Sequence, residues 1–327
     1  MTIQKSAPRH LSRILRVALL LLPLSYAAMA VDTTAVSDEI PLVRKERHRT
    51  LLEGPPLWRL LVGSTYIAKG ILHVPTAEMQ KVLRSGKGDY LDLRIEAQDY
   101  LKAPAGFEVQ PIKIRYFCEK KTTSYQPPVS KVRELDGKVV IAFLHKTTEK
   151  PQFGNGEIYF ASHSAESLQS FDEALERQVR EELARQKAIL TSPEQRYDAK
   201  RDPLYPRVKG IITRMTVASE QHKAFADLER LGQPAVPAII ALMDDRRDLA
   251  EKRISLENKS PGAFEGLRHY NASKVIDALD AILNQLTGLA LGTSYFDDSD
   301  AARVEAVNAW RVYRHYLLEP EDQAQDR

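Results

Sequence analysis

The chain has 327 residues, of which 43% are hydrophobic and 28% charged, and this is long enough for two ordinary globular domains. Its 47 Lys and Arg residues and 44 Asp and Glu residues give a formal net charge of +3. The only cysteine is Cys118, so an intramolecular disulfide is excluded and the fold must rest on its core.

Residues 1–30 have the three-part form of a secretory signal peptide. The basic start holds four residues, Lys5, Arg9, Arg13 and Arg16. An apolar run follows from Val17 to Leu24, and the small residues Ala28 and Ala30 mark the expected cleavage site. Because this run is far shorter than the roughly 20 residues that span a bilayer, we favour cleavage over a retained anchor. We therefore expect a periplasmic or secreted protein.

Removal of this leader changes the charge of the chain. The leader carries four basic and no acidic residues, so residues 31–327 hold 43 basic and 44 acidic residues, a formal net charge of −1. Nucleic-acid binding depends on a basic footprint, so no nucleic-acid partner is expected. No segment after the leader is apolar enough to predict a membrane span. Residues 31–57 have mixed charge and two adjacent prolines, and are predicted to be a mobile N-terminal segment.

Residues 58–165 are predicted to form a β domain. Polar and apolar side chains alternate over 90–97 and 112–118, whereas the continuous apolar run 138–144 indicates a strand covered on both faces. The remaining strands are expected within 60–74 and 157–161. Roughly five short strands in this length predict a small β barrel or sandwich. This half loosely resembles the small OB-type barrels of secreted bacterial proteins.

Cys118 lies on the apolar face of the strand predicted at 112–118, together with Ile112, Ile114 and Tyr116. We therefore expect a buried core thiol. A reactive thiol or an intermolecular pairing is the alternative.

The hydrophobic period changes near residue 168, and an amphipathic helix is predicted over 166–190. Its apolar stripe holds Phe171, Leu175, Val179 and Leu183. Ser170 and Glu173 predict a capping box at its start. Three prolines within 191–206 indicate a linker, 207–320 is predicted to be helical, and 321–327 is a polar tail.

The stretch LGQPAVPAIIALM, from Leu231 to Met243, predicts a tight turn between two helices. Gly232 suits a left-handed helix end, and Pro234 and Pro237 suit the start of the next helix. An apolar stripe lies on each side of the turn. Ala224, Phe225 and Leu228 belong to the helix before it, and Val236, Ile239 and Ile240 to the helix after it. Such a helix pair buries its apolar face only against stacked neighbours.

The segment LERLGQPAVPAIIALMDD resembles a HEAT-like repeat, with its Leu-Gly helix end, Pro-Ala-Val-Pro turn and acidic finish. A second similarity covers VIDALDAILNQLTG and RVEAVNAWRVYRHYL, which resemble the closing part of HEAT-like domains in secreted bacterial proteins. The matching positions are Asn284, Gln285, Thr287, Gly288 and Trp310. The resemblance implies a short helical array, in which Trp310 is expected to be a core anchor rather than a binding aromatic.

One segment, Asp244 to Tyr270, interrupts the predicted helix pairs with dense charge and Ser260-Pro-Gly262. A loop of this length in a compact array is usually functional or flexible. A partner-binding surface is therefore one hypothesis, and its candidate residues are Arg253, Glu257, Asn258, Lys259, Arg268 and His269. The favoured alternative is a solvated helix and turn, in which Arg253 and Glu257 form an ion pair.

No catalytic, metal or cofactor motif is present in the sequence. The histidines are scattered, and no Gly-x-Ser-x-Gly elbow or Gly-Lys-Ser/Thr phosphate loop is found. Asp297, Asp298 and Asp300 lack the spacing of a calcium loop and precede a predicted helix, so Ser299 or Asp300 is expected to cap it. We therefore predict no catalytic residues, no metal and no cofactor.

Together these patterns predict an α+β protein, with a small N-terminal β barrel or sandwich followed by a C-terminal all-α HEAT-like helical array. The expected function is protein–protein interaction with an unidentified partner in the cell envelope. The alternative is a binder of a small molecule or envelope component in a cleft between the two halves. An enzyme of unrecognised type is a third hypothesis.

Overall fold

A computed structural model describes residues 56–85, 89–118, 129–146, 159–161, 165–192, 197–252, 254–257, 267–270, 272–289, 291 and 299–318. All of them belong to one of the two compact units of the chain, Asp38–Arg327. The predicted leader and the predicted tail lie outside the described residues, as does the predicted N-terminal segment up to residue 55.

The first described element is a helix rather than a strand. It is α2 (Leu57–Val62), which follows Pro56 in an extended conformation and ends at Gly63. Trp58 and Leu61 lie one turn apart on it and are both buried. The prediction of β structure from residue 58 was therefore wrong for this segment, where a short apolar run fits a buried helix as well as a strand.

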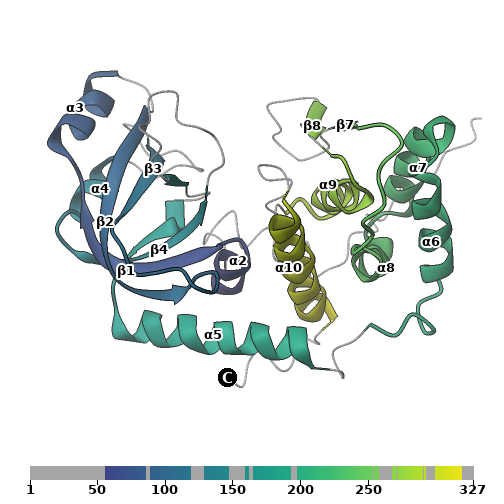
Figure 1. The fold of residues 1–327 in the computed structure, drawn as a ribbon, viewed down its shortest axis with the longest axis horizontal. Coiled ribbons are helices and arrows are strands. Elements are labelled where there is room, and N and C mark those ends of the chain that lie inside the picture. Colours follow the sequence, from purple (N-terminus) through teal and green to yellow (C-terminus); the bar gives the residue numbers. More distant parts are fainter. Residues whose placement is uncertain are drawn as a thin grey trace, which may run out of the picture. The chain divides into compact units, whose positions relative to one another are not determined.

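Six strands form one sheet. They are β1 (Tyr66–His73), β2 (Asp89–Lys102), β3 (Ile112–Cys118), β4 (Val139–Lys146), β5 (Tyr159–Ala161) and β6 (Leu168–Ser170). Their order is β1-β2-β3-β5-β4-β6, and β1 also pairs with β4. Figure 1 labels the four longer strands, β1 to β4. All pairs are antiparallel except β3 with β5.

The alternation read from the sequence is confirmed in β2, where Leu91, Leu93 and Ile95 are buried. The intervening Asp92, Arg94 and Glu96 are exposed. The continuous apolar run is confirmed as β4, which is covered on both faces. Val140, Ala142 and Leu144 join one hydrophobic cluster, and Ile141 and Phe143 join another.

Helices cover both faces of these strands. On one side lie α3 (Thr76–Ser85) and α4 (Val129–Glu134), which contribute Met79, Val129 and Val132 to the larger cluster. On the other lies α5 (Glu173–Thr191), whose predicted apolar stripe packs on Ile67, Ile141 and Phe143. The cap of α5 differs from the prediction, because Asp172 accepts a hydrogen bond from the Ala174 amide at 2.8 Å.

The second half of the chain begins after residue 197 and contains five α-helices in its described part. They are α6 (Tyr205–Arg214), α7 (Ala218–Leu231), α8 (Val236–Ala241), α9 (Val275–Thr287) and α10 (Asp300–Leu318). Their buried side chains form the largest hydrophobic cluster among the described residues, which also includes Trp58 from α2 and Ile189 from α5. Trp310 is fully buried there, as predicted.

The turn at Gly232 is confirmed in position and differs in conformation. Gly232 follows α7 with φ 67° and ψ −160°, which is not the left-handed helical region. A short 3-10 turn, η2 (Gln233–Ala235), then follows with Pro234 as its second residue, and α8 carries Pro237 in its first turn. Gly288 after α9 does adopt the left-handed conformation, with φ 70° and ψ 10°.

The predicted fold class was wrong. The first half is not all β, because α2, α3 and α4 are interleaved with its strands. The second half is not all α, because β7 (Ile254–Glu257) and β8 (Leu267–Tyr270) form an antiparallel hairpin between α8 and α9. The described chain is therefore a mixed α/β protein, not a β barrel or sandwich followed by a helical array. None of its described helices is long and apolar enough to cross a membrane.

Candidate functional site

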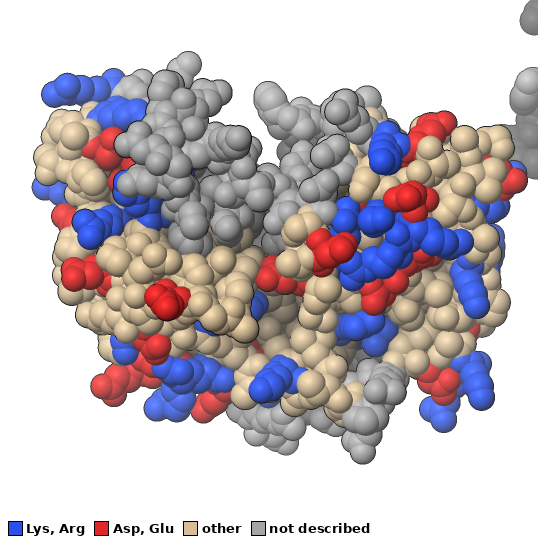
Figure 2. All heavy atoms as spheres, in the orientation of Figure 1, with Lys and Arg blue, Asp and Glu red and all other residues tan. Residues whose placement is uncertain are grey.

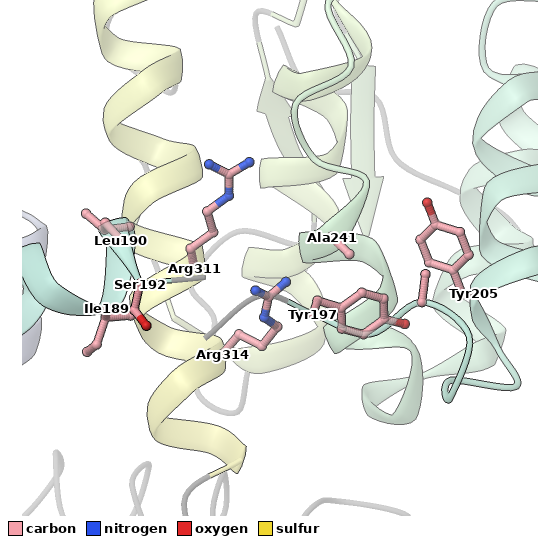
Figure 3. A pocket seen from close by; sticks show the side chains of 9 residues that line it. Ile189, Leu190, Ser192, Tyr197, Tyr205, Ala241, Arg311 and Arg314 are labelled. Carbon is pink, nitrogen blue, oxygen red and sulfur yellow. The ribbon is translucent and has the colours of Figure 1, made fainter. Parts of the chain in front are cut away.

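A pocket of about 390 Å³ opens where the end of α5 meets the start of α6, the end of α8 and the face of α10. Its volume falls within the roughly 300–1,000 Å³ typical of small-molecule sites. The described residues that line it are Ile189, Leu190, Ser192, Tyr197, Ala199, Tyr205, Ala241, Arg311 and Arg314 (Figure 3). The lining thus combines apolar and aromatic surface with two guanidinium groups.

The two arginines come from one face of α10. Arg311 and Arg314 are three residues apart, so their side chains leave neighbouring turns on the same side of the helix. Figure 3 shows both extending from α10 on the side where Ala241 and Tyr197 lie. The helix itself is fixed by Trp310, which is fully buried and whose indole donates to Asp280 at 2.6 Å.

Arg314 is the unusual residue of the pocket. It is only 8% exposed, and no carboxylate among the described residues forms an ion pair or hydrogen bond with it. Its guanidinium lies 5.2 Å from the ring centre of Tyr197, a cation–π arrangement. Burial lowers the pKa of Arg314, the charge of Arg311 lowers it further, and Tyr197 partly opposes the shift. An arginine nevertheless stays charged in a protein.

The position of Tyr197 is fixed by a hydrogen bond from its hydroxyl. Its hydroxyl donates to Asp202, whose second carboxylate oxygen accepts from the Leu204 amide at 2.7 Å. Burial and the bond to Asp202 raise the pKa of the Tyr197 hydroxyl, so it remains protonated. The Tyr197 and Tyr205 rings lie 5.7 Å apart at 38° and form an aromatic wall.

The other buried arginine of the described chain, Arg303, is paired within the fold. Arg303, also on α10, pairs with Asp277 of α9 at 2.8 Å, and both side chains are 5% exposed. Hydrogen bonds from Arg303 to Ser273 and Asp300 complete its shell. Arg314 has no comparable carboxylate partner among the described residues, so its charge is available to a ligand.

The predicted partner surface is not brought together as a described site. Arg253, Asn258 and Lys259 lie outside the described residues. The other three positions lie on the hairpin, Glu257 on β7 opposite Leu267, and Arg268 and His269 on β8 opposite Leu256 and Ser255. The alternative of a solvated helix was wrong for 254–257, which is a strand.

Charges near this segment are mostly paired within the chain. Arg246 contacts Asp244 and Asp300, and Arg247 contacts Asp245 at 2.6 Å. On the face shown in Figure 2, basic and acidic side chains correspondingly lie next to each other. The aspartate partners of Arg246 and Arg247 therefore offset part of the positive charge on this surface.

Within the described part of the chain, no histidine or carboxylate lines the pocket. The polar side chains of the described lining are those of Ser192, Tyr197, Tyr205, Arg311 and Arg314. No group of three or more His, Cys, Asp and Glu side chains gathers among the described residues either. Cys118 ends β3, but its side chain lies outside what the structure describes.

This pocket was not predicted from the sequence, although one signal was present. Arg314 follows Trp310 by four residues and therefore falls on the apolar stripe of α10, where a charged residue is unexpected. Arg303 falls on the same stripe and is explained by Asp277. Tyr197 and Tyr205 gave no signal, because both lie in the segment 191–206 that was predicted to be a linker.

Comparisons with known proteins supply no relative. No protein family matches the chain, and no curated protein or solved structure resembles it significantly. The HEAT-like resemblance therefore stays a prediction.

Proposed function

We propose that the protein is an exported binding protein that holds a small anionic ligand in the pocket beside α10. The observation that carries the proposal is Arg314, a residue only 8% exposed that lines the pocket and has no carboxylate partner in the described chain. Burying an unpaired charge is costly, and such groups normally find a counter-ion. A ligand anion is the counter-ion that the described lining does not supply.

The rest of the pocket suits the remainder of such a ligand. Ile189, Leu190 and Ala241 offer apolar surface, and Tyr205 adds an aromatic face beside Tyr197. This combination of apolar lining with a few polar groups is typical of sites for small organic molecules. Export is the second part of the proposal, and it rests on the form of residues 1–30.

Small-molecule binding was the alternative hypothesis from the sequence, and the pocket now favours it over partner binding. Partner binding at the hairpin remains a prediction, since three of its six residues lie outside the described chain. The side chains of Glu257, Arg268 and His269 are not described either.

The test is calorimetric titration of the full chain with four benzene derivatives: benzoate, phenyl phosphate, phenyl sulfate and neutral phenol. We expect at least one of the anions to bind and phenol not to bind. We expect Arg314→Met to abolish that binding, because the charge is removed while the side-chain volume is largely kept. An Arg94→Gln variant is the control, since Arg94 lies exposed on β2. If no anion binds, or if binding survives in Arg314→Met, the proposal is wrong.

A further inference from the structure

We infer that the ligand of this pocket carries a phosphate monoester dianion on an apolar or aromatic organic group. This inference rests on the proposed function and narrows it to one class of anion. Three features support it: the two arginines that line the pocket without a carboxylate partner in the described chain, their arrangement on α10, and the part of the pocket volume that a phosphate group does not fill.

Charge is the first argument. Two guanidinium groups, Arg311 and Arg314, line the pocket, and no carboxylate among the described lining residues offsets them. A carboxylate or a sulfate ester brings one negative charge, which leaves one cation uncompensated. A phosphate monoester carries about −1.5 to −2 charges at pH 7, so it balances both.

Geometry is the second argument. Arg311 and Arg314 leave α10 one turn apart, and Figure 3 shows their guanidinium groups at different levels along the helix. A planar carboxylate satisfies one guanidinium fork bidentately, and its two oxygens are then used. A phosphate has three terminal oxygens in a tetrahedral arrangement, so it accepts from a second fork that approaches from another direction.

Arg314 is also oriented by its aromatic neighbour. Its guanidinium lies over the Tyr197 ring at 5.2 Å, and that ring is held by Asp202. An arginine that uses its face for a ring keeps its in-plane N–H groups free to donate. Those donors are the ones that recognise phosphate bidentately.

Volume is the third argument. A phosphate group alone occupies only a small part of a cavity of about 390 Å³. The rest of the described lining is apolar or aromatic, from Ile189, Leu190, Ala241 and Tyr205. The Tyr205 hydroxyl makes no hydrogen bond to the described residues, so it is available to a polar atom of the organic group.

The first experiment compares phenyl phosphate, phenyl sulfate, benzoate and inorganic phosphate by calorimetry at pH 7.5. We expect phenyl phosphate to bind at least tenfold more tightly than each of the other three. Arg311→Gln should lower the affinity for phenyl phosphate at least tenfold and remove its advantage over benzoate, whereas Arg94→Gln should change neither. Arg311 is exposed on α10, so its replacement leaves the folded core intact.

The second experiment uses pH, because the second proton of a phosphate monoester leaves near pH 6. If the dianion is the bound species, the affinity for phenyl phosphate rises about tenfold between pH 5 and pH 7.5. Binding of phenyl sulfate, which keeps one charge throughout, should not change. A guanidinium group is not deprotonated in a protein over this range, so the phosphate is the group that changes charge.

The outcomes separate the two proposals. If benzoate or phenyl sulfate binds through Arg314 as tightly as phenyl phosphate, the inference fails and anion binding stands. If no anion binds, both fail.

A lipid source is tested by sedimentation with phosphatidylcholine vesicles with and without phosphatidic acid, whose headgroup is also a phosphate monoester. Sedimentation with phosphatidic acid in the absence of phenyl phosphate binding would overturn the inference of a soluble ligand.

Discussion

At the scale of single residues, two arginines on one helix have opposite environments. Arg303 and Arg314 both lie on the apolar stripe of α10, and both are buried. Asp277 cancels the charge of Arg303 within the chain, whereas the described residues leave that of Arg314 uncancelled. The first arginine therefore belongs to the fold, and the second is assigned to a ligand.

This contrast predicts different stabilities for two matched variants. Arg303→Met leaves the buried Asp277 carboxylate without its partner, so we expect a loss of about 3–5 kcal/mol in the free energy of unfolding. Arg314→Met removes a buried charge that has no counter-ion, so the unliganded protein should keep or gain stability. Urea unfolding of both variants measures the difference. Equal losses would contradict the assignment of the two arginines.

The Asp277–Arg303 pair also predicts a pH dependence. Burial by itself raises the pKa of Asp277, but hydrogen bonds from Arg303 and from the Ser273 and Lys274 amides outweigh it, so the net pKa lies below the ordinary 3.8. A lowered folded-state pKa contributes stability that is present above the unfolded pKa and is lost as the pH falls through the folded pKa. Wild type should therefore lose more stability than Asp277→Asn between pH 5 and pH 2.5. A difference in the free energy of unfolding between wild type and Asp277→Asn that stays constant over this pH range would argue against the pair.

At the scale of elements, the glycines show where backbone space is limiting. Gly70 lies at an irregular register of β1 and β2, and a Cβ there would come within 2.3 Å of the Glu96 carbonyl oxygen. Gly210 lies exposed within α6, and a Cβ there meets no atom within 4 Å. The same substitution should therefore have opposite effects at the two positions.

We expect Gly70→Ala to destabilise the protein by about 1–3 kcal/mol or more, because the strands must separate to admit the methyl group. Gly210→Ala should stabilise it by about 0.4–1 kcal/mol, because alanine reduces the entropy of the unfolded chain in a helical position. Thermal unfolding of the pair measures both signs. A neutral Gly70→Ala would show that β1 and β2 are less closely packed than described.

The elements that were predicted from the sequence are those in which apolar residues recur at a regular spacing. Alternation located β2 and β3, and the four-residue stripe located α5, because these patterns persist over several residues. The short α2 was missed because six residues carry too little periodicity. The β7–β8 hairpin was missed because each strand has only four residues, too few to show an alternation, and the charged segment around it resembles a solvated helix face. The pocket was missed because its lining comes from separate segments that no local pattern connects.

At the scale of the whole described chain, two helices belong to more than one core. In α2, Trp58 joins the helical cluster and Leu61 joins the cluster on the strand face. In α5, Val179 packs on the strand face and Ile189 on the helical cluster. Gln186 of α5 donates to the Trp58 carbonyl at 3.0 Å, and Glu182 accepts from Tyr316 of α10 at 2.6 Å. The described residues therefore should unfold as one cooperative unit.

Tryptophan fluorescence tests this cooperativity, because both tryptophans of the chain, Trp58 and Trp310, lie in the helical cluster. Urea transitions followed by fluorescence and by far-ultraviolet circular dichroism should coincide. Leu61→Ala should lower both midpoints equally, at a cost of about 2–5 kcal/mol, although Leu61 packs against strands. Two separate transitions, or a fluorescence midpoint that Leu61→Ala leaves in place, would refute the shared core.

The stacking of Trp58 on Tyr316 also limits how this protein can be divided or recombined. The rings lie 5.2 Å apart at 23°, and they join the first described helix to the last. A fragment that holds only residues 197–318 keeps most of the helices but loses this indole and the Ile189 wall of the pocket. The helical half therefore cannot be transferred to another protein by itself. A fusion or recombined protein must include the chain from α2 onward to keep the pocket intact.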